Sequence, residues 1–244
     1  MSNLNILLRN SPNFNKKIRL KKDVKCIVIH YTGMQSEVAA INRLSNPKSK
    51  VSCHYLISQK GQIIKMVDEK HEAWHAGKSK WKKLSSLNKS SIGIELTNLG
   101  HEFGYKDFKK KQILILIKLL KILIKKYNIK KDYVVGHSDI APLRKKDPGE
   151  KFPWKKLAQL GIGIWHKLNT KVLLNNRNKT VEKKNKLVFF KYLKKIGFQI
   201  NFNLKNIKYE KKLIKAFQRR FRPEKISGIL DEECLLIAKN LSNY

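Results

Sequence analysis

Short apolar runs alternate with helical patterns along the first two thirds of the chain. Runs with the β-branched or alternating character of strands occupy residues 24–29 (VKCIVI), 51–58 (VSCHYLIS), 62–67 (QIIKMV), 90–98 (SSIGIELTN) and 132–137 (DYVVGH). Gln59, Lys60 and Gly61 separate the second run from the third, which predicts a hairpin. Helical periodicity covers residues 36–44 and 107–127. This order predicts an α/β fold in which helices flank a mixed central β-sheet.

The last third of the chain has a different pattern. From Gly161 to about Lys186 the periodicity dissolves into Asn, Lys and Thr, which is typical of a linker. Helical periodicity then returns in LVFFKYLKKIGF, LIKAFQRRF and DEECLLIAKNL, and the last of these opens with an acidic first turn. We therefore expect a first domain over residues 1–166, a linker over 167–185 and a small three-helix domain over 186–244.

The composition is that of a folded but strongly basic protein. Of the 244 residues 41% are hydrophobic, which is enough for one sizeable core and a small second domain. The 54 Lys and Arg residues against 18 Asp and Glu give a net charge of +36, which favours polyanions such as nucleic acid, membrane surfaces or acidic glycans. The lysines are scattered through every segment, so a generally lysine-rich composition explains them at least as well as a nucleic-acid footprint. No specific nucleic-acid partner is predicted, because no recognised binding motif accompanies the charge.

Neither a disulfide framework nor a membrane span is indicated. Cys26, Cys53 and Cys234 are odd in number and far apart, which indicates isolated buried thiols. The most apolar stretch, 113–124, falls short of the ~20 residues that cross a bilayer. The apolar run at residues 6–8 is too short for the core of a secretory signal, so we expect a cytoplasmic protein.

Residues 71–75, HEAWH, match the H-E-x-x-H pattern of zinc proteases. In that pattern one helical turn brings both imidazoles to one metal ion, and Glu95 would be available as a third ligand. Gly77, Lys78 and Ser79 follow, however, and the preceding KMVDE indicates a strand that runs into a turn. Because no helix is indicated here, the match is weak support for a zinc protease.

A better metal site is indicated at the ends of two strands. His30 ends the first strand, His137 ends the last, and Asp147 follows ten residues later in a rigid loop. Two imidazoles and one carboxylate form a ligand set that zinc accepts while its fourth position stays open. Each residue alone is weak evidence, because a single histidine at a strand end is more often simply hydrogen-bonded.

Five strings in a fixed order carry a family resemblance: IVIHYTGM, VSCHYLIS, AWHAG, SIGIEL and GHSDIAPLRKKDPGEKFPW. Over residues 10–160 the chain resembles the zinc-dependent N-acetylmuramoyl-L-alanine amidases of type 2, related to phage amidase-lysozymes and peptidoglycan recognition proteins. The resemblance implies one Zn²⁺ per chain, held by His30, His137 and Asp147. It also implies that AWHAG lines a substrate groove, so that His71 and Glu72 complete the H-E-x-x-H pattern by chance.

The implied reaction is hydrolysis of the amide between N-acetylmuramic acid and L-alanine in peptidoglycan or muropeptides, as in cell-wall turnover and recycling. Strand alternation places Glu95 opposite the apolar face of Ile94 and Leu96. The pattern alone leaves a solvated glutamate equally open, whereas the resemblance implies a general base. Lys145 is implied to stabilise the oxyanion. The alternative is a non-catalytic peptidoglycan recognition protein of the same fold, which has no need for all of these residues.

Four further residues are expected to contact the substrate, namely Trp74, His75, Asn88 and Arg144. A purely structural role is the alternative for His75. Arg144 is either the bidentate partner of a peptide carboxylate or an exposed structural arginine.

The C-terminal strings AFQRRFRP and G-x-L-D resemble a small peptidoglycan-binding domain that is appended to such amidases. A groove between its helices would hold glycan or peptide and raise the local concentration of the scissile bond. A helical bundle that only packs on the enzyme is the alternative. A wall-binding domain suits the periplasm, which stands as the alternative to a cytoplasmic location. The expected partner is peptidoglycan or a muropeptide, and no oligomeric state follows from the sequence.

Overall fold

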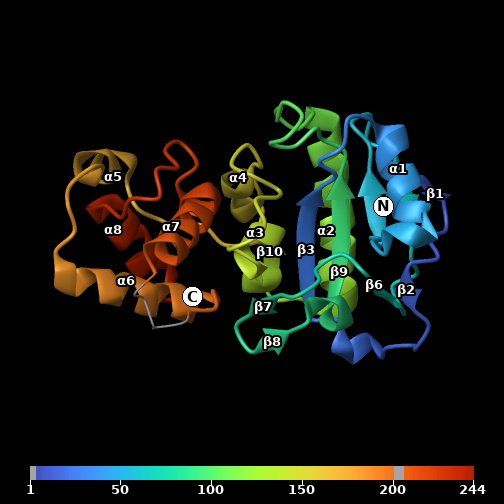
Figure 1. Cartoon of the computed structure of the whole chain (residues 1–244), viewed down its shortest axis with the longest axis horizontal. Helices are drawn as coiled ribbons and strands as arrows, with labels where there is room; N and C mark the ends of the chain where they lie inside the picture. Colours follow the sequence, from blue (N-terminus) through green and yellow to red (C-terminus); the bar gives the residue numbers. More distant parts are fainter. Residues whose placement is uncertain (1–3, 201–205) are drawn as a thin grey trace.

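A computed structural model describes residues 4–200 and 206–244 of the chain (Figure 1). The strands are β1 (Ile6–Leu8), β2 (Phe14–Asn15), β3 (Cys26–Tyr31), β4 (Tyr55–Ile57), β5 (Ile63–Lys65), β6 (Glu72–Ala73), β7 (Lys80–Trp81), β8 (Leu84–Ser85), β9 (Ser91–Leu96) and β10 (Val134–Gly136). The helices are α1 (Glu37–Ser45), α2 (Lys110–Tyr127), α3 (His137–Ile140), α4 (Trp154–Gln159), α5 (Thr170–Asn176), α6 (Lys183–Ile196), α7 (Ile207–Phe221) and α8 (Glu232–Leu241). The predicted strand 51–58 is shorter than expected, because the Ser52 amide donates to the carbonyl of Trp74 and not to a neighbouring strand.

A six-stranded mixed sheet forms the centre of the molecule, in the order β1-β5-β4-β9-β3-β10. The β4–β5 pair is antiparallel and forms the predicted hairpin, whereas every other neighbouring pair is parallel. The prediction of a mixed α/β sheet flanked by helices is therefore confirmed.

Helix α2 covers one face of this sheet (Figure 1). Its apolar side chains pack on strand residues that follow the period of two, among them Ile27 and Ile29 of β3 and Ile92, Ile94 and Leu96 of β9. The opposite face of the same strands is thereby left to His30 and Glu95.

On that opposite face, two apolar clusters flank the polar residues. Leu56 of β4 packs with Ala40 and Leu44 of α1. Val28 of β3 and Val135 of β10 pack instead into a cluster with the C-terminal helices. Because Leu56, Glu95 and His30 are neighbours in register across β4, β9 and β3, the polar pair lies between the two clusters.

The C-terminal helices lie beyond β10, with α3 and α4 between them and the sheet (Figure 1). Their core, which includes Phe189, Phe190 and Phe217, is continuous with Val28 and Val135 of the sheet. The predicted helical segments are present as α6, α7 and α8, while the stretch expected as a linker contains α5. The helical region therefore shares an apolar core with the sheet.

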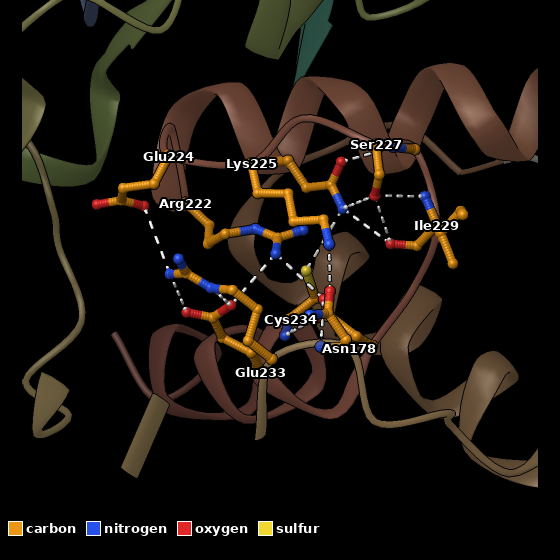
Figure 2. Close-up of polar contacts among 12 residues, drawn as sticks. Asn178, Arg222, Glu224, Lys225, Ser227, Ile229, Glu233 and Cys234 are labelled. Atoms are coloured by element: carbon orange, nitrogen blue, oxygen red, sulfur yellow. Dashed lines mark hydrogen bonds and ion pairs between the residues drawn. The ribbon is translucent and has the colours of Figure 1, made fainter. Parts of the chain in front are cut away.

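A network of buried charges holds the C-terminal helices together (Figure 2). Arg222, from the string AFQRRFRP, is buried and lies 3.1 Å from Asp231 and 3.2 Å from Glu233. Arg177 donates two hydrogen bonds to Glu233, of 2.7 and 2.8 Å. Because Asp231 also caps the N-terminus of α8 through the Cys234 amide, the network joins α7, α8 and the segment after α5.

The three cysteines are buried and unpaired, as expected. Among the described helices, none combines the length and the apolar character needed to cross a membrane.

Candidate active site

Three ligand atoms converge where β3, β10 and the loop after α3 meet. Nδ1 of His30 lies 3.0 Å from Nδ1 of His137 and 3.0 Å from Oδ2 of Asp147, and His137 Nδ1 lies 3.1 Å from the same carboxylate oxygen. All three residues are buried. Two ring nitrogens and a carboxylate oxygen aimed at one point form a donor set that fits a divalent cation such as zinc.

Local structure explains how these residues meet. His30 lies on β3 and His137 directly follows β10, which is the parallel neighbour of β3. The amide of Ser138 donates to the carbonyl of Asp147 at 2.8 Å, which ties the ligand loop to α3. Gly149 stands at φ +85° and a Cβ there would come within 2.6 Å of the Tyr105 ring, so this loop needs glycine at that position.

Burial and mutual charge shift the titration of these groups. Burial and the neighbouring charge of His137 lower the pKa of His30 to about 4. Burial alone would raise the pKa of Asp147, but the charge and hydrogen bond of His137 and the hydrogen bond of His30 outweigh it and hold this pKa far below its usual range. At neutral pH His30 is thus a neutral imidazole and Asp147 a carboxylate, the protonation states that metal ligands need.

Glu95 projects into the same site without a partner for one carboxylate oxygen. It is the register neighbour of His30, and its Oε2 is buried with no hydrogen-bond partner among the described residues. Burial and the charge of Asp147 raise the pKa of Glu95 to about 8, while Lys145 acts in the opposite direction. A carboxyl group with a proton affinity near neutrality suits general acid–base work.

A cavity of 660 Å³ opens over these groups. Lys145 and Arg144 line it from the ligand loop, and Trp74 lines it from the segment after β6. Its wall also includes His30, His75, Glu95, His101, His137 and Asp147. The structure thus brings the expected metal ligands, Glu95, Lys145, Trp74, His75 and Arg144 to one cavity.

The H-E-x-x-H match does not form a helical metal site. Glu72 and Ala73 form strand β6, paired antiparallel to β2, and not the helix that the pattern requires. The ring of His71 packs on Phe14 at 4.8 Å, away from the converging ligand atoms. Among the described residues, the group suited to hold a metal is the one formed by His30, His137 and Asp147.

Asn88 and Arg144, both expected to contact substrate, hold the backbone beside the candidate metal ligands. Oδ1 of Asn88 accepts hydrogen bonds from the amides of His75, at 3.2 Å, and Ala76, at 2.7 Å. Arg144 donates through Nη2 to the carbonyls of Ala76, at 2.5 Å, and Lys78, at 2.8 Å. Substrate contact by these residues stays a prediction.

Sequence reasoning missed a buried arginine of the C-terminal helices that contacts Asp139, two residues after His137. Arg220 of α7 stacks on Trp154, with Cζ 3.2 Å from the ring centroid, and its Nη1 lies 3.4 Å from Oδ2 of Asp139. The same oxygen accepts the amide of Gly136, directly before His137, at 2.7 Å. The only signal was an Arg–Arg pair between two phenylalanines, which a lysine-rich chain makes easy to overlook.

Comparisons with known proteins agree with this geometry. A family model described as N-acetylmuramoyl-L-alanine amidase matches residues 20–150. The N-acetylmuramoyl-L-alanine amidase AmiD of Escherichia coli is 36% identical over 235 residues, which is 89% of this chain and 82% of AmiD. The 1,6-anhydro-N-acetylmuramyl-L-alanine amidase AmpD of Haemophilus influenzae is 33% identical over 164 residues, or 60% of this chain and 86% of AmpD.

Similarity extends to three-dimensional structure. The solved complex of E. coli AmiD with the substrate anhydro-N-acetylmuramic acid-L-Ala-D-gamma-Glu-L-Lys superposes with a TM-score of 0.80 at 34% identity. The match covers 94% of this chain and 92% of that one, so it includes the C-terminal helices as well as the sheet.

Proposed function

The chain belongs to the N-acetylmuramoyl-L-alanine amidase family and is an amidase of that kind, and we propose that it is zinc-dependent and acts on muropeptides or peptidoglycan. The scissile bond is the amide between N-acetylmuramic acid and L-alanine. The observation that carries the proposal is the convergence of His30, His137 and Asp147 beside Glu95 in one cavity. A protein that only binds peptidoglycan has no need for that arrangement.

Zinc held by the three ligands would polarise the scissile carbonyl as a Lewis acid and make water a better nucleophile. Glu95 takes the proton of the attacking water and then delivers it to the leaving nitrogen. Its raised pKa, about 8, supports delivery of a proton near neutral pH, and the charge of a bound Zn²⁺ would lower this pKa so that the carboxylate can first take the proton of the water. The ammonium of Lys145, on the wall of the same cavity, stabilises the oxyanion.

The proposed substrate contacts are Trp74, His75, Asn88 and Arg144. Trp74 and Arg144 line the cavity, where a planar ring and a guanidinium suit a sugar and a stem-peptide carboxylate. The names of the relatives support a muropeptide, because AmpD is named for a 1,6-anhydro sugar and AmiD is solved with an anhydro-muropeptide.

We extend the proposal to the C-terminal helices, which would bind peptidoglycan and keep the enzyme near its substrate. A groove of 390 Å³ between α6 and α7 supports this role, with Lys183, Lys186 and Lys211 on its wall. We propose that the protein is a cytoplasmic enzyme that recycles wall fragments. The alternative is a periplasmic enzyme.

One assay tests the activity and the metal together. Purified protein is incubated with anhydro-muropeptide, with and without a strong chelator, and the products are identified by mass. We expect free stem peptide and free sugar, lost after chelation and restored by zinc. Unchanged activity after complete removal of metal would refute the zinc proposal, and a product cut elsewhere would refute the assigned bond.

A further inference from the structure

We propose that the segment Ala73–Gly77, called here the AWHAG segment, fixes the tautomer of both histidine ligands from outside the metal site, with His75 as a positioning residue. The inference rests on the proposed zinc site and names the residues that prepare it. Nε2 of His30 lies 3.0 Å from Nδ1 of His75, and Nε2 of His137 lies 3.2 Å from the carbonyl oxygen of Ala76. The ring nitrogens of His30 and His137 that point away from the candidate metal site therefore both contact the AWHAG segment.

The protons in this chain of contacts can be assigned from its far end. Oγ of Ser91 lies 2.5 Å from the carbonyl of Leu87 and 3.2 Å from Nε2 of His75. A carbonyl only accepts, so the hydroxyl proton of Ser91 points to Leu87, and Ser91 accepts from His75 Nε2–H. A neutral imidazole has one N–H, so Nδ1 of His75 is bare and accepts from Nε2–H of His30.

The same reasoning leaves both ligand nitrogens free for a cation. In the metal-loaded site His30 carries its proton on Nε2, so its Nδ1, which hydrogen-bonds to Asp147 when no cation is bound, offers its lone pair to the cation. Nε2 of His137 has two polar neighbours, the carbonyl of Ala76 at 3.2 Å and Nη2 of Arg144 at 3.4 Å. The nearer one, the carbonyl, accepts from Nε2–H, which leaves Nδ1 of His137 facing the same point as Nδ1 of His30.

The fold holds His75 in this position from two sides. A Cβ at Gly93 would come within 2.6 Å of Cδ2 of His75, so only glycine leaves room for the ring on that strand. Asn88 fixes the backbone of His75 and Ala76 through its side-chain oxygen. A hydrogen-bonded outer partner of this kind orients a ligand histidine and sets its basicity.

The first test reads the tautomer directly. In zinc-loaded, ¹⁵N-labelled protein, long-range ¹H–¹⁵N correlation spectra should show His75 with its proton on Nε2 and Nδ1 unprotonated. His30 and His137 should both carry Nε2–H. A proton on Nδ1 of His75 would overturn the assignment. Protein that binds no zinc at all would instead refute the proposed function, so the two failures are distinguishable.

The second test measures zinc affinity by competition with a chromophoric chelator. His75→Phe removes the acceptor for His30 and should weaken zinc binding about 10- to 100-fold, with an altered absorption spectrum of the cobalt-substituted protein. His71→Phe, in the same stretch but against Phe14, is the matched control and should leave both unchanged. His75→Asn, whose amide oxygen can replace Nδ1 as acceptor, should recover most of the affinity.

Should His75→Phe fail to fold, Ser91→Ala gives the same information, because it keeps the imidazole and removes only the acceptor of its Nε2–H. We expect weaker zinc binding in this variant and a mixture of His75 tautomers. Wild-type affinity in folded His75→Phe, or in Ser91→Ala, would overturn the inference even if the enzyme is an active zinc amidase.

Discussion

His30 and Glu95 are register partners on the adjacent parallel strands β3 and β9, so their side chains rise from the same face of the sheet at the same level. The apolar residues that alternate with them are buried against α2 on the other face. The sheet itself therefore sets the distance between the proposed metal ligand and the proposed base, and neither residue depends on a loop for its position.

Glu95→Gln should keep zinc and lose turnover. The amide has nearly the shape of the carboxylic acid but cannot take a proton from water, so we expect kcat to fall by about 10²- to 10⁴-fold. Zinc content and zinc affinity should stay within a few-fold of wild type, because Glu95 is not one of the three ligands. Glu72→Gln is the control and should be active; loss of zinc in Glu95→Gln would contradict the proposed role.

His71→Ala should have almost no effect on zinc binding or on activity. The ring lies against Phe14 and not among the ligand atoms, so we expect zinc content and kcat/KM close to wild type. His137→Ala should lose tight zinc binding and activity, because it removes one of three ligands. The measurement is zinc content by elemental analysis beside the rate of muropeptide cleavage. A folded His71→Ala protein that binds no zinc would indicate that His71 is a zinc ligand, as in the zinc-protease pattern.

Periodicity was enough to predict the face on which the chemistry occurs. The alternation in residues 90–98 predicts Glu95 opposite the apolar face, and the ends of two strand-like runs predict His30 and His137 as neighbours of a metal. Both features are local, since a period of two needs only one strand. The order of the strands, which brings β9 beside β3, is a long-range property that no single run contains.

The outer layer of the site could not be predicted in the same way. Ser91 is the first residue of β9 and gives no signal of its own, yet its hydroxyl ends the chain of contacts that begins at His30. In the sequence Arg220 is one of many basic residues of its helix, and only the three-dimensional structure shows that it is buried against Trp154. Such contacts join segments far apart in sequence, and their pairing is decided by tertiary packing.

We expect protonation of His54 to lower the free energy of unfolding in mild acid. It is buried, and burial together with the charge of Arg19 lowers its pKa to about 3, against 6.5 when unfolded. The unfolded chain therefore binds the proton more readily, so the contribution of His54 is complete above pH 6.5 and is lost as the pH falls toward 3. Below 6.5 this loss is about 1.4 kcal/mol per pH unit.

The contribution of His54 can be isolated by comparison with His54→Asn. Asparagine can still accept the hydrogen bond that Gly93 N–H donates to Nδ1, at 3.0 Å, but it does not titrate. Urea unfolding of both zinc-free proteins between pH 7 and 5 should give a flatter profile for the variant. Parallel profiles would show that folding does not lower the pKa of His54 and would contradict the assignment.

Arg220→Met should destabilise the whole protein, and not only its C-terminal helices. The substitution removes the partner of Asp139, which is buried on α3 and accepts a hydrogen bond from the amide of Gly136, directly before His137. Loss of one member of a buried ion pair costs about 3–5 kcal/mol, because the other charge is left without compensation. Lys208→Met, exposed on the same helix, is the control and should change the free energy of unfolding by less than about 0.5 kcal/mol.

The double variant Arg220→Met with Asp139→Leu tests the cause of this loss. It removes the uncompensated charge of Asp139, so it should recover part of the lost stability. A double variant less stable than Arg220→Met would show that Asp139 is stabilised by groups other than Arg220.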